Sequence, residues 1–153
     1  MATPPKPRVF VDADVLFAGA ASPSEHGASL VVLRLAEITL IDAVVSEQVI
    51  IEVERNLADY LSSALPTFRQ LVSRCVRVVA DPAPDQLVAY HGLADPKDTP
   101  ILAAAVQADC PWLVTFNVRH FQPGHPTVTV ARPGEFVQHV RALLASMSLR
   151  KAP

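Results

Sequence analysis

The sequence has little charge and little excess of either sign. Only 18% of its 153 residues are charged, and 15 acidic side chains against 13 basic ones give a formal net charge of −2. A protein that coats nucleic acid with a basic surface would carry a clear positive excess, so this class gains no support. An enzyme that acts on nucleic acid is still allowed, because an acidic metal site can mask basic residues in the total.

Cysteine is also scarce, which narrows the covalent and metal chemistry that the chain can carry. Cys75 and Cys110 are far apart and form no C-x-x-C pair, so we expect two reduced thiols in the core rather than a disulfide or a zinc site. The five histidines show no spacing typical of zinc ligands.

Long apolar runs are missing too. No stretch is long enough to cross a bilayer, and the polar start "MATPPKP" does not look like a signal peptide, so we expect a cytoplasmic protein without a membrane partner. Half of the residues are hydrophobic, which suffices for a substantial core in a chain of one-domain size. We expect a single domain over 1–153, with a loose tail at 1–7 and a frayed end at 148–153.

Short apolar segments alternate with segments of helical periodicity. Strands are predicted at 8–13, 38–46, 76–80, 112–116 and 127–131, and helices at 28–38, 47–65, 66–75, 99–110 and 133–147. The segment 22–27 is a predicted turn, 81–98 mixes turns with a short helix, and Ser46 is the expected N-cap of the helix that follows it. This order predicts an α/β fold in three layers, with helices on both faces of a mostly parallel sheet of about five strands.

Acidic and amide side chains follow several of these strands. They are Asp12 and Asp14 after the first strand, Glu52 and Glu54 on the helix after the second, Asp95 and Asp98 before the Ala-rich helix, and Asn117 after the fourth strand. Ligands of open parallel sheets bind beyond the carboxyl ends of the strands. We therefore expect these side chains to meet at one edge of the sheet.

Motifs for other chemistries are absent. The sequence has no G-x-G-x-x-G after the first strand, no Walker A loop and no G-x-S-x-G elbow. Oxygen ligands remain, and Mg²⁺ or Mn²⁺ prefers them. A carboxylate site for such an ion suits phosphodiester hydrolysis by a metal-activated water.

Three segments in order, "VFVDADVLFAG", "VVSEQVIIEVERNL" and "DPKDTPILAAAVQADCPWLVTFNVRHF", resemble the PIN domain family. This family includes the VapC-type toxins of bacterial toxin–antitoxin pairs and other metal-dependent ribonucleases. The resemblance runs from about Arg8 to the closing helix. It implies a PIN-like fold, an Mg²⁺- or Mn²⁺-dependent endoribonuclease acting on RNA, a small antitoxin that occludes the site, and a homodimer.

The resemblance also assigns residues. Asp12, Glu52 and Asp98 match the three metal-binding acids, and Asn117 falls where many members have a fourth acid. The neutral amide weakens the case for a second tightly held metal, although Asp95 could supply the missing charge.

Each of these residues also has a purely structural interpretation. Asp12 could start a turn, Asp14 could cap or organise the loop after the strand, and Asp98 could cap a helix. Glu52 competes with Glu54 and Glu47. It flanks the apolar stripe at Val49, Val53 and Leu57, whereas Glu54 is expected nearer to solvent.

Thr115 and the nearby cations carry weaker expectations. Thr115 could bond a site carboxylate or simply end a strand. The cations Arg55, Lys97, Arg119 and His120 could meet RNA phosphates or be ordinary surface charge.

Three rival functions are left open. A PIN-like RNA-binding or regulatory module with little or no catalysis would bind RNA without metal, and the neutral Asn117 is its sequence support. A structure-specific DNA nuclease is disfavoured, since the chain has no room for a clamp or extra helices. An α/β domain with an acidic rim and a different ligand would bind neither Mg²⁺ nor Mn²⁺.

Overall fold

The computed structural model describes residues 6–21 and 27–150. The expected turn at 22–27, apart from Gly27, and residues 1–5 of the expected tail lie outside the described part. The strands are β1 Arg8–Val11, β2 Asp42–Ser46, β3 Val76–Val79, β4 Trp112–Val114 and β5 Thr129–Ala131. The α-helices are α1 Ala13–Ala21, α2 Ala28–Glu37, α3 Glu47–Tyr60, α4 Leu65–Cys75, α5 Thr99–Gln107 and α6 Pro133–Arg150. Short 3₁₀ turns occupy Ser62–Ala64, Pro84–Tyr90 and Val118–Phe121.

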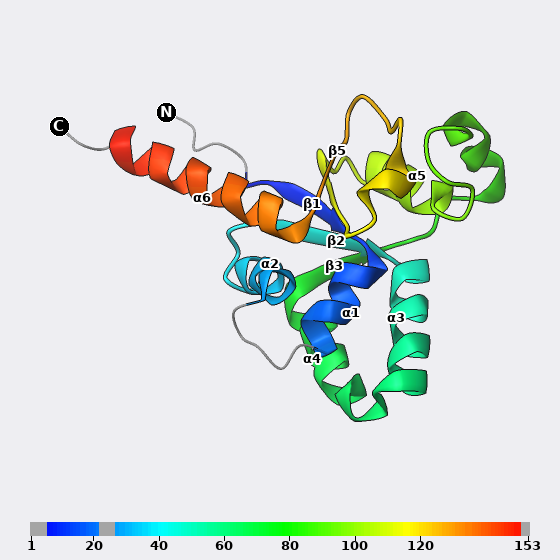
Figure 1. Cartoon of the computed structure of the whole chain (residues 1–153), viewed down its shortest axis with the longest axis horizontal. Coiled ribbons are helices and arrows are strands. Elements are labelled where there is room, and N and C mark those ends of the chain that lie inside the picture. Colours follow the sequence, from blue (N-terminus) through cyan, green and yellow to red (C-terminus); the bar gives the residue numbers. More distant parts are fainter. Residues whose placement is uncertain (1–5, 22–26, 151–153) are drawn as a thin grey trace.

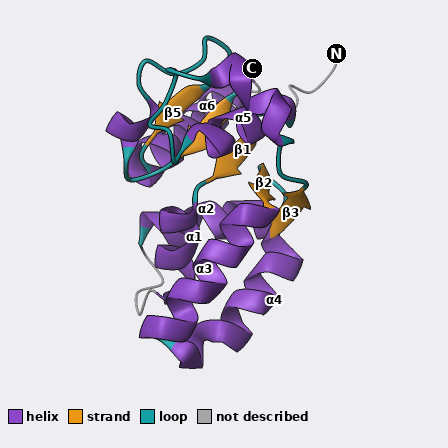
Figure 2. Cartoon of the chain, turned by 90° about the vertical axis from the view of Figure 1, so that its right-hand side faces the viewer, coloured by secondary structure: helices purple, strands orange, loops and turns teal. Residues whose placement is uncertain are grey.

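The five strands form one sheet in the order β3-β2-β1-β4-β5, and every neighbouring pair is parallel. Helices α1 to α4 lie on one side of this sheet, and α5 lies on the other (Figures 1 and 2). The predicted α/β fold with a parallel five-stranded sheet is therefore confirmed. Because all strands run the same way, their carboxyl ends share one edge of the sheet.

Strand β1 lies at the centre of the sheet. Val9, Phe10 and Val11 are each fully buried, as a strand covered on both faces requires. Strand β1 pairs with β2 on one side and β4 on the other. The residue that follows it, Asp12, is thereby placed in the middle of the carboxyl edge.

Helix α1 is the element that sequence patterns do not predict. Its residues are almost all apolar or small, so they show no polar face and no helical periodicity. The helix is packed between α2 and α3, and a Cβ atom at Gly19 would come within 2.6 Å of Leu33 Cδ1 on α2. Glycine thus allows α1 and α2 to approach closely.

Other boundaries differ from expectation in small ways. Helix α6 continues to Arg150, into the segment 148–153 where fraying is expected, and residues 151–153 lie outside the described part. The short helix expected within 81–98 is the 3₁₀ turn Pro84–Tyr90. Cys75 and Cys110 are buried free thiols, as expected. Among the described residues, no helix has the length and apolar character that crossing a membrane demands.

The start of α3 shows how a cap can come from a distant segment. Ser46 occupies the N-cap position, as predicted, but its side chain makes no capping hydrogen bond. The backbone N–H of Gln48 instead donates to Asp81 Oδ1 at 2.9 Å, and Asp81 follows β3. The loop after β3 therefore anchors the first turn of the helix that carries Glu52.

Candidate functional site

A hollow of about 270 Å³ lies at the carboxyl edge of the sheet. Its walls come from four segments: the end of β1 with the start of α1, the start of α3, the start of α5, and the loop after β4. The lining residues are Asp12, Ala13, Asp14, Gln48, Glu52, Lys97, Asp98, Ile101, Asn117 and His120. The structure thus brings together Asp12, Glu52, Asp98 and Asn117, the four residues predicted to form a catalytic centre.

Asp12 is the most deeply placed carboxylate in the hollow. Its side chain accepts hydrogen bonds from the backbone N–H of Ala13 at 2.8 Å and from the Thr115 hydroxyl at 2.9 Å. Burial, followed by the nearby carboxylate of Asp14, raises the pKa of Asp12 to about 7. The ionised form of a carboxylate that is buried in this way is strongly stabilised by a bound cation.

Asp14 holds the loop after β4 in place. Its Oδ2 accepts hydrogen bonds from the backbone N–H of Phe116 at 3.0 Å and from the side-chain amide of Asn117 at 3.2 Å. The Thr115 hydroxyl lies 3.3 Å from the same oxygen, so its single proton is placed between Asp12 and Asp14. Burial raises the pKa of Asp14 as well. The loop-organising interpretation of Asp14 and the expected contact of Thr115 with a carboxylate both match this geometry.

Glu52 reaches the hollow from the first half of α3. The stripe at Val49, Val53 and Leu57 is buried, as predicted, and turns Glu52 toward the other acids. Burial, then the charges of Asp98 and Asp14, raises the pKa of Glu52. Glu54 lines no part of this hollow.

Glu54 turns toward α4 rather than fully to solvent. Its Oε1 lies 3.9 Å from Arg69 Nε, and its side chain is 42% exposed. Glu52 is the more exposed of the two residues, so the expectation that Glu54 lies nearer to solvent is wrong, because α4 covers that flank of α3.

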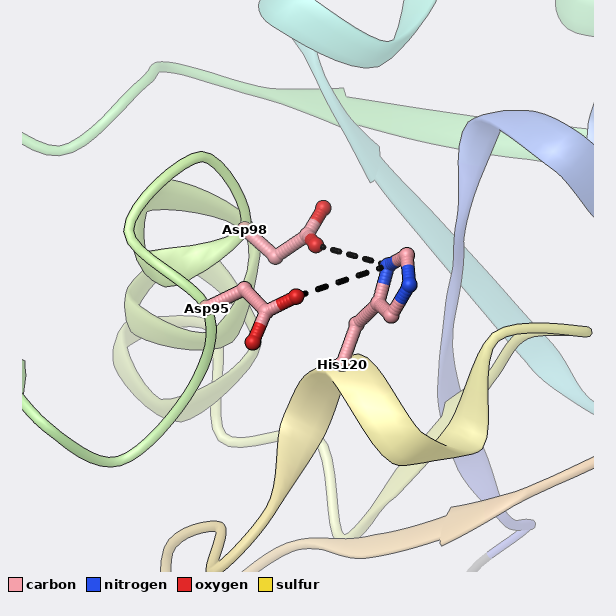
Figure 3. Close-up of side chains that lie close together, drawn as sticks. All are labelled: Asp95, Asp98 and His120. Carbon is pink, nitrogen blue, oxygen red and sulfur yellow. Dashed lines mark ion pairs between the residues drawn. The ribbon is translucent and has the colours of Figure 1, made fainter.

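Asp98 combines an N-cap position with a free carboxylate. It precedes α5, but its side chain makes no capping hydrogen bond. Its Oδ2 is buried and accepts no well-directed hydrogen bond from the described residues, although His120 Nδ1 lies 3.2 Å away (Figure 3). Burial raises the pKa of Asp98, and the charges of Lys97 and His120 oppose this rise. A buried carboxylate oxygen without a partner is the clearest sign that a cation belongs here.

Asp95 lies close to Asp98 but outside the hollow. It does not line the hollow, and its side chain is half exposed. Its Oδ2 lies 4.0 Å from His120 Nδ1, so Asp95, Asp98 and His120 form a group on one side of the hollow (Figure 3). The backbone of Asp95 has a clear structural role, because its carbonyl accepts hydrogen bonds from the N–H groups of Asp98 and Thr99.

Of the cations expected near the site, the structure places two in the hollow. Lys97 and His120 line it, whereas Arg55 and Arg119 do not. The sequence did not pair His120 with Asp98. The available signal was its position three residues after Asn117, since residues at i and i+3 of a 3₁₀ turn lie on the same side.

The hollow fits a hard divalent cation. The donors that face it are carboxylates and an amide from Asp12, Glu52, Asp98 and Asn117, which is the oxygen-rich set that Mg²⁺ and Mn²⁺ prefer. The raised pKa of Asp12 indicates negative charge that lacks a counter-ion, and the buried Oδ2 of Asp98 has no hydrogen-bond partner among the described residues.

Comparison with known proteins gives a family and two solved structures. The family model described as PIN domain matches residues 8–119. The structure of VapBC2 from Rickettsia felis bound to a DNA fragment from their promoter is similar at a TM-score of 0.62 and 14% identity, covering 82% of this chain and 98% of that one. PAE2754 from Pyrobaculum aerophilum is similar at 0.64 and 17%, covering 90% and 97%. No curated protein matches the chain. At such identities the solved structures indicate a shared fold.

Proposed function

Because the chain belongs to the PIN domain family, we propose that it is a nuclease of the hydrolase class, and specifically an Mg²⁺- or Mn²⁺-dependent endoribonuclease. The observation that carries the proposal is the convergence of Asp12, Glu52 and Asp98 on one hollow. These three acids come from segments far apart in the chain, and Asp98 keeps a buried oxygen without a hydrogen-bond partner.

Asp12, Glu52 and Asp98 would hold the ion, and Asn117 would lie beside it. When bound, Mg²⁺ or Mn²⁺ supplies a lowered pKa for an attacking water and positive charge for the phosphate oxygens. The Thr115 hydroxyl keeps the carboxylate of Asp12 turned to the hollow, and Asp14 keeps Thr115 and Asn117 in position. Lys97 at the rim offers a cation to the phosphate that enters.

The structure gives the binding-module alternative little support. That alternative rested on the neutral Asn117, but the amide of Asn117 donates to Asp14. The hollow is lined by four carboxylates, from Asp12, Asp14, Glu52 and Asp98, in addition to the amide of Asn117. Charge for a divalent ion is available without an acid at 117.

We also propose that the protein is the toxin of a type II toxin–antitoxin pair, works in the cytoplasm and forms a homodimer. The similar structure named VapBC2 is a complex bound to a fragment of promoter DNA, and it supports an antitoxin as the partner. The neighbouring reading frame tests the toxin–antitoxin pairing, and the mass of the purified protein in solution tests the homodimer.

The proposal is tested by incubating purified protein with mixed cellular RNA in Mn²⁺, and in EDTA. We expect fragments in Mn²⁺ only, and none from Asp12→Asn. The matched control is Asp59→Asn, which makes the same change at an exposed acid of α3 outside the hollow. A parallel reaction with single-stranded DNA separates a ribonuclease from a DNA-directed nuclease. Cleavage that persists in EDTA or in Asp12→Asn, or no cleavage by folded, metal-supplied protein, contradicts the proposal.

A further inference from the structure

A second hollow, of about 440 Å³, opens beside the first and shares two of its residues. It is lined by Asp14, Phe17, Glu52, Asn56 and Tyr60. Asp14 and Glu52 also line the carboxylate hollow, so the two hollows adjoin at these side chains. A strand that is bound at the carboxylates and extends past Asp14 and Glu52 reaches the second hollow.

The second hollow lies between α1 and α3, which are side by side in both views of the molecule (Figures 1 and 2). Both helices begin at the carboxyl edge of the sheet and run away from it, because each follows a parallel strand. Glu52, Asn56 and Tyr60 are spaced by four residues and form one stripe along α3. Tyr60 lies about 12 Å beyond Glu52 along the helix axis. A group bound at Tyr60 would therefore lie farther along α3 than a phosphate bound at the acids.

The side chains of this stripe suit a planar, neutral ligand. Tyr60 is 81% exposed, which is unusual for so large an aromatic group, and Phe17 is only partly covered. The Asn56 amide can both donate and accept hydrogen bonds. No basic residue lines the hollow, so it is not built for a phosphate. Proteins stack unpaired bases on aromatic rings and recognise the edges of those bases by hydrogen bonds from groups such as amides.

We propose that the hollow between α1 and α3 binds a nucleobase of single-stranded RNA, one that flanks the bond to be cut, by stacking on Tyr60 and Phe17 and by hydrogen bonding to Asn56. This inference rests on the proposed ribonuclease function, and it assigns the substrate of that site: an unpaired strand. A base within a duplex offers no free face to Tyr60.

The first test is Tyr60→Leu, which removes the aromatic face and keeps an apolar side chain. We expect the KM for RNA cleavage in Mn²⁺ to rise about tenfold with kcat nearly unchanged, since stacking contributes equally to substrate and transition state. Tyr60→Trp should keep KM near the native value. Ile51→Ala is the matched control, because Ile51 is a 55% exposed apolar residue of the same helix outside both hollows.

A second measurement does not depend on cleavage. Binding of a short, labelled single-stranded RNA, followed by fluorescence anisotropy in Ca²⁺, should weaken about tenfold in Tyr60→Leu and stay unchanged in Ile51→Ala. Asn56→Ala should reduce the difference in affinity among the four homopolymer RNAs, since the amide would no longer read the base edge.

The outcomes separate the two proposals. If native protein cleaves RNA but Tyr60→Leu has native KM and native affinity, the nucleobase site is wrong and the ribonuclease stands. A fall in kcat with no change in KM would show that Tyr60 positions the acidic side chains rather than a base. It would also contradict the proposed nucleobase site. Unchanged RNA binding with loss of binding to a protein inhibitor would show that the hollow docks protein. If the native protein neither cleaves nor binds RNA, both proposals fail together.

Discussion

The side-chain amide of Asn117 donates a hydrogen bond of 3.2 Å to Oδ2 of Asp14, and this bond joins the loop after β4 to the first turn of α1. The two positions are coupled by charge. An amide at 117 can donate to an acid at 14, whereas a second acid at 117 would lie against it. The neutral residue at 117 is therefore explained by its hydrogen bond to Asp14.

We predict that Asn117→Asp destabilises the metal-free protein at pH 8 by on the order of 1 kcal/mol, because the hydrogen bond to Asp14 would be replaced by repulsion between two carboxylates. The double variant Asp14→Asn with Asn117→Asp should recover that loss, since the amide and the acid have only changed places. Urea unfolding of the native protein, both single variants and the double variant measures the coupling. Simple additivity of the two single changes would contradict it.

The acid cluster should make the metal-free protein less stable as the pH rises. The pKa of Asp12 is about 7 in the folded state and near 3.8 in an unfolded chain, so folding takes up a proton between these values. Stability is then greatest below about pH 4 for this group, falls as the pH rises to about 7, and is constant above that. The raised pKa values of Asp14, Glu52 and Asp98 act in the same direction.

We therefore predict that Asp12→Asn removes part of this pH dependence. The variant should be more stable than the native protein at pH 8 without metal, by up to about 4 kcal/mol, and the difference should shrink at pH 5. The measurement is chemical denaturation in EDTA at both pH values. Equal stabilities of the two proteins at pH 8 would show that the Asp12 carboxylate is not strained by burial. Asp59→Asn serves as the control, since Asp59 is exposed.

Much of this arrangement could be predicted from the sequence. The apolar strand at Arg8–Val11 and the alternation of strands and helices indicated a parallel sheet, and a parallel sheet brings the residues after its strands to one edge. That rule placed the acids and the amide that follow these strands together, and the resemblance to the PIN domain selected Asp12, Glu52, Asp98 and Asn117 among them. The apolar stripe on α3 placed Glu52 on its flank, but it did not predict that α4 covers Glu54.

The parts that could not be predicted depend on tertiary contacts. Helix α1 has no polar face because α2 and α3 cover it, so hydrophobic periodicity could not predict this helix. Asp95 is close to Asp98 in sequence, yet the turn before α5 directs its carboxylate outside the hollow. The pairing of His120 with Asp98 joins the loop after β4 to the start of α5, and the spacing of His120 from Asn117 could indicate its place in the hollow but not its partner.

Binding of Mn²⁺ should stabilise the protein through Asp98. The buried Oδ2 of that residue has no hydrogen-bond partner among the described residues and only His120 Nδ1 close by, at 3.2 Å, so a bound cation would stabilise it. We predict that saturating Mn²⁺ raises the Tm at pH 8, and raises it less at pH 6, because the acids must lose their protons to bind. In Asp98→Asn most of the Mn²⁺-dependent rise should disappear, whereas Asp59→Asn should keep it. A thermal-shift titration measures this. A rise in Tm with Mn²⁺ that is as large in Asp98→Asn as in the native protein would show that Asp98 does not bind the ion.

Asp81 and Ser46 allow the cap of α3 to be assigned by a matched pair of substitutions. Sequence alone favours Ser46, but the bond to the first turn of α3 comes from Asp81, whose Oδ1 accepts from the N–H of Gln48 at 2.9 Å. We predict that Asp81→Ala lowers the free energy of unfolding by about 1 kcal/mol, while Ser46→Ala changes it far less. Because α3 carries both Glu52 and Gln48 into the hollow, Asp81→Ala should also weaken Mn²⁺ binding slightly. Urea unfolding and the thermal-shift titration read the two effects. A larger loss of unfolding free energy from Ser46→Ala than from Asp81→Ala would show that Ser46 caps α3. The loop after β3 would then not position the helix that carries Glu52.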